Sequence, residues 1–270
     1  RPLAALAWLE RAIERAPQSG RAPAIFGLIA EAAQGTLISL ERELDLLHLR
    51  RRLQRVEFAN IKQQGYFYSL SFQIRIQRAM EQGSGSDELD QLIDEWDEQT
   101  QDPAQAHLLV AICYIQIAHA RVHQCLRGTP SQRTRALPKL ARALRDLERV
   151  RRVPLVTVHL AFTGAAHSYF SGREAEGELL LAEAERAAQT HGCVWVSVAA
   201  ARLRAHQLRA RGLEQAASDQ ASAAEVIARK YAQLFYMRCI HDELGLVAPR
   251  AEQPHGEVDA QRVRRHLEAL

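Results

Sequence analysis

A succession of helical segments separated by short turns constrains the fold of this chain more than any other feature. Apolar residues recur every three to four positions over stretches of about 12 to 23 residues, and glycine, proline or small polar residues separate these stretches. Such regular alternation predicts antiparallel helix pairs. The expected helices are residues 3–16, 22–34, 36–62, 66–82, 86–100, 104–127, 131–151, 154–171, 173–191, 193–211, 213–231, 233–245 and 256–270.

The C-terminal half repeats itself. Gly172 and Gly212 each separate two predicted helices and lie one 40-residue interval apart. An interval that is kept at several positions indicates a repeat architecture. Further matches at this interval are Ala184 with Ala224, Ala188 with Ala228, and residues 193–195 with 233–235.

Small and large residues alternate inside this unit in a way that is typical of tightly crossing helices. The positions are Ala165, Gly172, Gly177, Leu181 and Ala184. Because of residues at these positions, the stretches 161–188 and 201–228 resemble tetratricopeptide (TPR) repeats. The resemblance is to the longer, 40-residue variety in the sensor regions of large bacterial signalling ATPases and kinase-ATPase proteins.

The resemblance implies an all-α fold in which antiparallel helix pairs stack as a right-handed superhelix, an α-solenoid. It also implies a concave surface, lined by the first helix of each unit, that takes an extended peptide or a partner helix. We expect TPR-like repeats over residues 101–248. Residues 1–100 are expected to form divergent repeats or a separate helical subdomain, and 249–270 a loop and a C-terminal capping or linker helix.

Composition and charge narrow the classes of function. Aromatic residues make up 6% of the chain and the net charge is only +3, so the chain offers few platforms for stacking bases, and its composition argues against nucleic acid as a partner. Arginine supplies 32 of the 35 basic residues, which we attribute to a GC-rich bacterial genome. Eight of these basic residues lie in 133–152, and they fit a solvated helix face better than a phosphate-binding surface.

An acidic helix is expected over residues 87–102, which hold eight acidic residues and no basic residue. Leu89, Leu92, Ile93 and Trp96 recur on one face, so the helix is amphipathic. The simpler interpretation is that this stripe packs on neighbouring helices. The alternative is that the acidic face docks a basic partner.

The chain shows no sign of export or membrane insertion. It has four widely spaced cysteines, no signal peptide and no run of 18 apolar residues, which favours free thiols in a reducing cytoplasm. Because the first residue is Arg1 and not methionine, we expect the sequence to be a piece of a larger protein whose other domains are among its partners.

Motifs for chemistry are weak. There is no phosphate-binding loop and no nucleophile signature, so we predict no catalytic residue, no cofactor and no enzyme activity. His119 and His123 lie one helical turn apart, with His107 on the same predicted helix, but Cys125 faces another side. The metal set is therefore incomplete, and we predict no metal.

The sequence thus favours a module that binds or regulates. Our leading hypothesis is a protein-interaction or regulatory scaffold in a bacterial signalling protein, and the alternative is a sensor that changes superhelix shape when it binds a small ligand or signalling peptide. A third hypothesis places enzyme activity in residues 1–100. The candidate groove residues are His159, Thr163, His167, Phe170, Arg202, His206 and Arg209.

Overall fold

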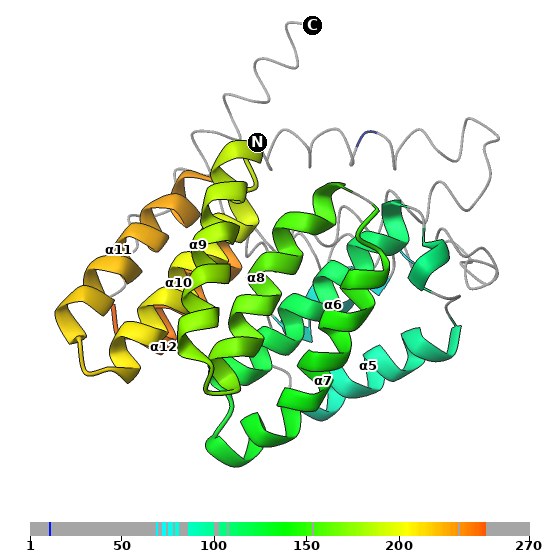
Figure 1. The fold of residues 1–270 in the computed structure, drawn as a ribbon, viewed down its shortest axis with the longest axis horizontal. Helices are drawn as coiled ribbons and strands as arrows, with labels where there is room; N and C mark the ends of the chain where they lie inside the picture. The colour runs from blue at the N-terminus through cyan, green and yellow to red at the C-terminus, as the bar shows by residue number, and fades with distance from the viewer. Residues whose placement is uncertain are drawn as a thin grey trace, which may run out of the picture.

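The computed structural model describes residues 11, 69, 72–73, 75–77, 79–80, 86–99, 103–106, 108–152, 154–231 and 233–246. Throughout these ranges the regular structure is helical, without a strand (Figure 1). The elements are α5 (Ser86–Gln99), the 3₁₀ turn η3 (Pro103–Gln105), α6 (Leu108–Arg127), α7 (Pro130–Arg149), α8 (Pro154–Phe170), α9 (Glu174–His191), α10 (Val194–Ala210), α11 (Glu214–Lys230) and α12 (Leu234–Leu244).

Consecutive helices pack as antiparallel pairs, as the sequence predicted. The pairs are α6 with α7, α8 with α9, and α10 with α11, and α12 follows beside α11. Helices α6, α8, α10 and α12 also contact one another across neighbouring pairs, and we call them the inner helices (Figure 1). Most predicted bounds agree to within two residues. The exception is the expected helix 104–127, where a separate turn at Pro103 precedes α6.

The turns at Gly172 and Gly212 are equivalent, which confirms the repeat at the level of the backbone. The two glycines have φ values of +76° and +75°, in the left-handed region that favours glycine. After each helix, a backbone amide reaches back to a carbonyl five residues earlier: Arg173 N to Ser168 O at 2.9 Å, and Leu213 N to Leu208 O at 3.0 Å. Both helix ends are closed by the same hydrogen-bonded motif.

Buried residues that are small, apart from Leu181, line the faces on which α9 and α11 pack. At Gly177, a Cβ atom would lie 2.9 Å from the ring of Tyr169 on α8, so the two helices approach too closely for any side chain. The buried set on α9 is Gly177, Leu181, Ala184 and Ala188, and the set on α11, 40 residues on, is Ala217, Ala221, Ala224 and Ala228.

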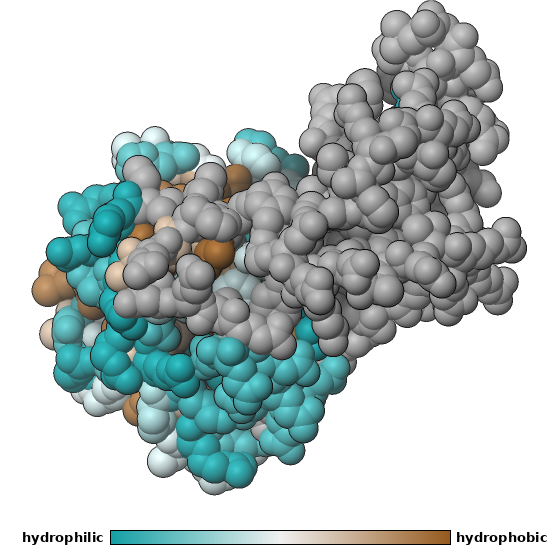
Figure 2. Space-filling view, turned by 90° about the vertical axis from the view of Figure 1, so that its right-hand side faces the viewer, coloured by the Kyte–Doolittle hydropathy of each residue, from teal (hydrophilic) through white to brown (hydrophobic). Residues whose placement is uncertain are grey.

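The acidic and basic segments face each other. Helix α5 buries Leu89, Leu92, Ile93 and Trp96 in the core, as the simpler interpretation predicted. Beside this stripe, Asp90 pairs with Lys139 of α7 and Arg121 of α6, and Asp97 lies 2.9 Å from Arg142. Figure 2 shows one face of the molecule, and hydrophilic residues gather on its lower part.

Several expected elements lie outside the described residues. They are the helices 22–34, 36–62 and 256–270, and the region 249–270; within the expected helix 3–16 only Arg11 is described, and it is helical. Of the expected helix 66–82, the described positions are helical, and Phe72 packs on Trp96 with ring centroids 4.4 Å apart. Within the described helices, none combines the length and apolar character needed to cross a membrane.

Candidate functional site

Polar side chains from all four inner helices meet in the interior. We call this set the inner polar cluster: His119 and His123 of α6, His159 of α8, Arg202 of α10, and Tyr236, Cys239 and Glu243 of α12. Each of their side chains is buried. Since buried polar groups are costly unless they are hydrogen-bonded, the partners of each group decide what the cluster can do.

The strongest contact of the cluster is the ion pair between Arg202 and Glu243. Arg202 donates from Nε to Glu243 Oε2 at 2.7 Å and from Nη2 to Oε1 at 2.5 Å. His206 Nε2 lies 2.9 Å from the same carboxylate. Burial would raise the pKa of Glu243, but Arg202 and His206 outweigh it and lower this pKa to about 2. The carboxylate is therefore charged at neutral pH.

Arg209 extends this contact to the end of α12. Its guanidinium donates to the carbonyl oxygens of Glu243 and Leu244, both at 2.6 Å. These carbonyls belong to the last turn of the helix, where no intrahelical donor remains for them. Arg202, His206 and Arg209 of α10 thus fix α12 by side-chain and backbone contacts alike.

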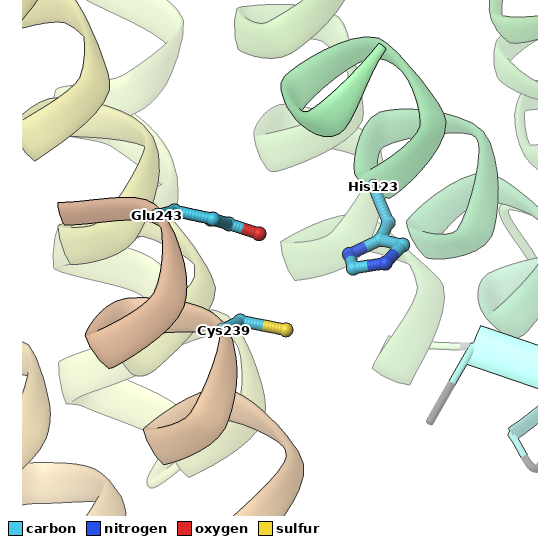
Figure 3. Close-up of side chains that lie close together, drawn as sticks. All are labelled: His123, Cys239 and Glu243. Atoms are coloured by element: carbon cyan, nitrogen blue, oxygen red, sulfur yellow. The ribbon is translucent and has the colours of Figure 1, made fainter. Parts of the chain in front are cut away.

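His123, Cys239 and Glu243 have the residue types of a metal site. Their potential ligand atoms lie within 4.8 Å of one another, and the three side chains point toward one another from α6 and α12 (Figure 3). However, Arg202 Nη2 lies 3.2 Å from His123 Nδ1 as well as 2.5 Å from Glu243. The Arg202 guanidinium therefore already occupies the place of a cation beside His123 and Glu243, and a metal ion would have to displace it.

A chain of hydrogen bonds crosses the other half of the cluster. Trp195 Nε1 donates to the Tyr236 hydroxyl, which lies 3.2 Å from His119 Nδ1. His119 Nε2 lies 2.8 Å from His159 Nδ1, and His159 Nε2 lies 3.7 Å from the Cys193 sulfur.

The tryptophan sets the direction of this chain, because an indole N–H can only donate. The Tyr236 oxygen accepts this bond, and its own proton finds an acceptor in His119 Nδ1. His119 and His159 then each carry their proton on Nε2. The opposite direction would leave the buried Tyr236 proton without an acceptor in the described part of the chain.

The three buried histidines are neutral at physiological pH. Burial lowers the pKa of His159 to about 4 and, together with Arg202, the pKa of His123 to about 3. The pKa of His119 is also lowered well below its usual value by burial and by its neighbours His159 and Arg202. Such weakly basic imidazoles suit a fixed hydrogen-bond network better than proton abstraction near pH 7.

The predicted groove residues are divided between the interior and the accessible surface. His159, Thr163 and Arg202 are 1%, 0% and 3% exposed. The others, His167, Phe170, His206 and Arg209, are partly exposed. Only Arg202, His206 and Arg209 meet at one place, around Glu243, whereas His167 contacts Arg173 at 3.1 Å and Phe170 lies under the guanidinium of Arg133.

The contribution of α12 was not predicted from the sequence. Tyr236, Cys239 and Glu243 lie on one face of this helix, at spacings of three and four residues, and this pattern could have indicated a polar stripe. His119 and His123 were considered as a metal pair, but their ring nitrogens bind different partners, Tyr236 and Arg202. His107 lies outside the described residues, and Cys125 is buried elsewhere in the core.

These features define an all-α protein built from sequential antiparallel helix pairs around a buried polar cluster. Comparison with protein-family models, with curated proteins and with solved structures found no match to the chain.

Proposed function

We propose that this chain is a TPR-like α-solenoid module of a larger bacterial signalling protein and that it acts by binding a protein or peptide partner. The observation that carries the proposal is the repeat itself. The pairs α8 with α9 and α10 with α11 place small buried residues at equivalent positions, 40 residues apart, and end their first helices in equivalent glycine turns. Stacked repeats of this kind present extended surfaces that suit partner binding.

The accessible residues among the predicted groove positions are the contact candidates in this proposal. His167 and Phe170 lie at the end of α8, and His206 and Arg209 lie toward the end of α10, all partly exposed. The buried positions His159 and Arg202 join inner helices to one another instead, and the buried Thr163 hydroxyl donates to the His159 carbonyl within α8. Because Arg209 and His206 also bind α12, His167 is the position at which a substitution separates binding from folding most cleanly.

The test compares two histidine substitutions that make the same change of charge. His167→Glu alters the inner helix α8, and His191→Glu alters an exposed position at the end of the outer helix α9. A partner is captured from the native lysate with the full chain, identified by mass spectrometry, purified and titrated against each variant. We expect His167→Glu to weaken the complex and His191→Glu to leave it unchanged, while circular dichroism shows both variants folded.

Equal affinities of the two variants for the purified partner would contradict the proposed surface. Binding that saturates with the unmodified chain is also required, because adsorption that does not saturate would speak against a specific module.

A second candidate function, a small-ligand sensor, is favoured by one observation. A cavity of about 380 Å³ lies among α5, α6 and α7, with Ala79 and Met80 also in its wall, and is lined in part by His123 of the inner polar cluster. Its volume falls in the range of small-molecule sites, about 300–1,000 Å³. A ligand there would lie next to the contacts that join α6 to α10 and α12.

A further inference from the structure

The cavity among α5, α6 and α7 has a positive lining. Arg127, Arg135 and Lys139 line it together with the carboxylates Asp87 and Asp90. Asp90 is already paired with Lys139 and with Arg121, which is buried behind it and does not line the cavity. With three cations and two carboxylates, Asp87 included, the lining carries a net charge of +1.

Two of these cations are available to a ligand. Arg135 is exposed and has no ion-pair partner among the described residues. Arg127 is 41% exposed and lies 3.7 Å from Glu243 and 3.9 Å from Asp242, both at the long end of ion-pair distances. Arginine is suited to such a role because its planar guanidinium can donate two parallel hydrogen bonds to one carboxylate or phosphate.

His123 adds a neutral donor whose direction is set by Arg202. A guanidinium can only donate, so His123 Nδ1, at 3.2 Å from Arg202 Nη2, accepts that hydrogen bond. The neutral ring then carries its proton on Nε2. His123 is 7% exposed and lines the cavity. Its second nitrogen is turned away from Glu243 (Figure 3), and the described residues provide no acceptor for this N–H.

We propose that this cavity binds a small organic anion, through a carboxylate or phosphate group held by Arg127, Arg135 and the Nε2–H of His123. The inference rests on the sensor form of the proposed function. It concerns a cavity beside the inner polar cluster and not the partner surface around His167, so either can fail without the other.

The test is calorimetric titration of the full chain with inorganic phosphate and, separately, with malonate, at constant ionic strength in sodium chloride. We expect saturable binding of at least one anion, and the tighter of the two identifies the group that the site prefers. Arg135→Gln should weaken binding at least about tenfold, because it removes a charged donor. Arg152→Gln, a matched loss of an exposed arginine outside the cavity, should change it by less than about twofold.

A second measurement addresses His123 directly. In the chain labelled with ¹⁵N-histidine, long-range ¹H–¹⁵N spectra should show His123 protonated on Nε2, with a shift of that resonance when the bound anion is added. Binding no tighter than that of chloride for both anions would overturn the proposal. So would an equal loss of affinity in Arg135→Gln and Arg152→Gln, or a His123 ring protonated on Nδ1.

Discussion

Arg202 and Glu243 form a two-bond ion pair between α10 and α12, with side chains only 4% and 7% exposed. A pair so deeply buried holds its geometry strictly, because either charge left alone would have to be accommodated in an interior with little water. The pair also binds His123 and His206, so it connects three of the four inner helices.

We predict that Arg202→Met lowers the free energy of unfolding by about 3–5 kcal/mol, since it leaves a buried carboxylate without its main partner. Arg204→Met is the control on the same helix. Arg204 also binds two carboxylates, Glu178 and Glu185, but it is 24% exposed, so its loss should cost only about 1 kcal/mol. Urea denaturation measures both.

The double variant Arg202→Met with Glu243→Met completes the cycle. Because it removes both buried charges, it should be more stable than Arg202→Met alone. A loss in Arg202→Met no larger than in Arg204→Met would show that the buried pair does not stabilise the fold.

Acid should destabilise the protein from about pH 6.5 downward. Burial lowers the pKa of His159 from 6.5 to about 4, so the folded state binds fewer protons than the unfolded state between these values. The corresponding stability, about 3 kcal/mol, is fully present above pH 6.5 and is lost as the pH falls toward 4. Glu243, with its pKa lowered from 4.5 to about 2, adds a further loss between those values.

His159→Asn tests the histidine part of this dependence. The asparagine side chain can still accept a hydrogen bond where Nδ1 accepts from His119, but it does not titrate. We expect the free energy of unfolding to change less between pH 6.5 and 4 than in the unmodified chain. His191→Asn controls for the loss of an exposed histidine, and an unaltered slope in His159→Asn would contradict the assignment.

Gly177→Ala should destabilise the α8–α9 pair, whereas Gly164→Ala should not. At Gly177 the new methyl group would lie 2.9 Å from the Tyr169 ring, which is buried and bonded to Glu178, and such overpacking costs about 1–3 kcal/mol. At Gly164 the nearest atom is the end of the Leu180 side chain at 3.4 Å.

The better helix propensity of alanine, worth about 1 kcal/mol, should then make Gly164→Ala neutral or stabilising. Thermal unfolding distinguishes the two. Equal effects would indicate that the small residue at position 177 is not needed for close packing.

One thiol should react much faster than the other three in the native protein. Cys193 is partly exposed, whereas Cys113, Cys125 and Cys239 are buried and burial raises their pKa values to about 12, 11 and 11. Because the thiolate is the reactive form, a thiol reagent should modify a single cysteine quickly and all four in denaturant. Cys193→Ala should abolish the fast phase, and a fast phase that survived this change would be inconsistent with the burial pattern.

The helix bounds of the C-terminal half could be predicted because local sequence determines them. Gly172 and Gly212 stop helices by adopting a left-handed conformation, which depends on few distant contacts. The separate turn at Pro103 was not predicted, because the local sequence there fits a continuous helix. A proline can begin a helix, and nothing local to it indicates that the helix restarts at Leu108.

The inner polar cluster could be predicted only in part. Choosing polar residues on the first helices included two members of the cluster, His159 and Arg202, and two residues that bind Glu243 beside it, His206 and Arg209. The contacts that complete the cluster join residues far apart in the chain: His119 and Tyr236 are 117 positions apart, and His123 and Arg202 are 79 apart. Such contacts depend on how tightly successive helix pairs curve, which no local pattern records.

In most repeat arrays each unit contacts only its neighbours, so the stack can extend and bend through small changes at each interface. Here α6 binds α10 and α12 directly, through His123 with Arg202 and His119 with Tyr236. A pull that separates α6 from α12 would load these bonds together with the interfaces between adjacent helix pairs. Under tension, α6 and α12 would stay together until the hydrogen bonds of the cluster break, and the helix pairs between them could move apart only after that.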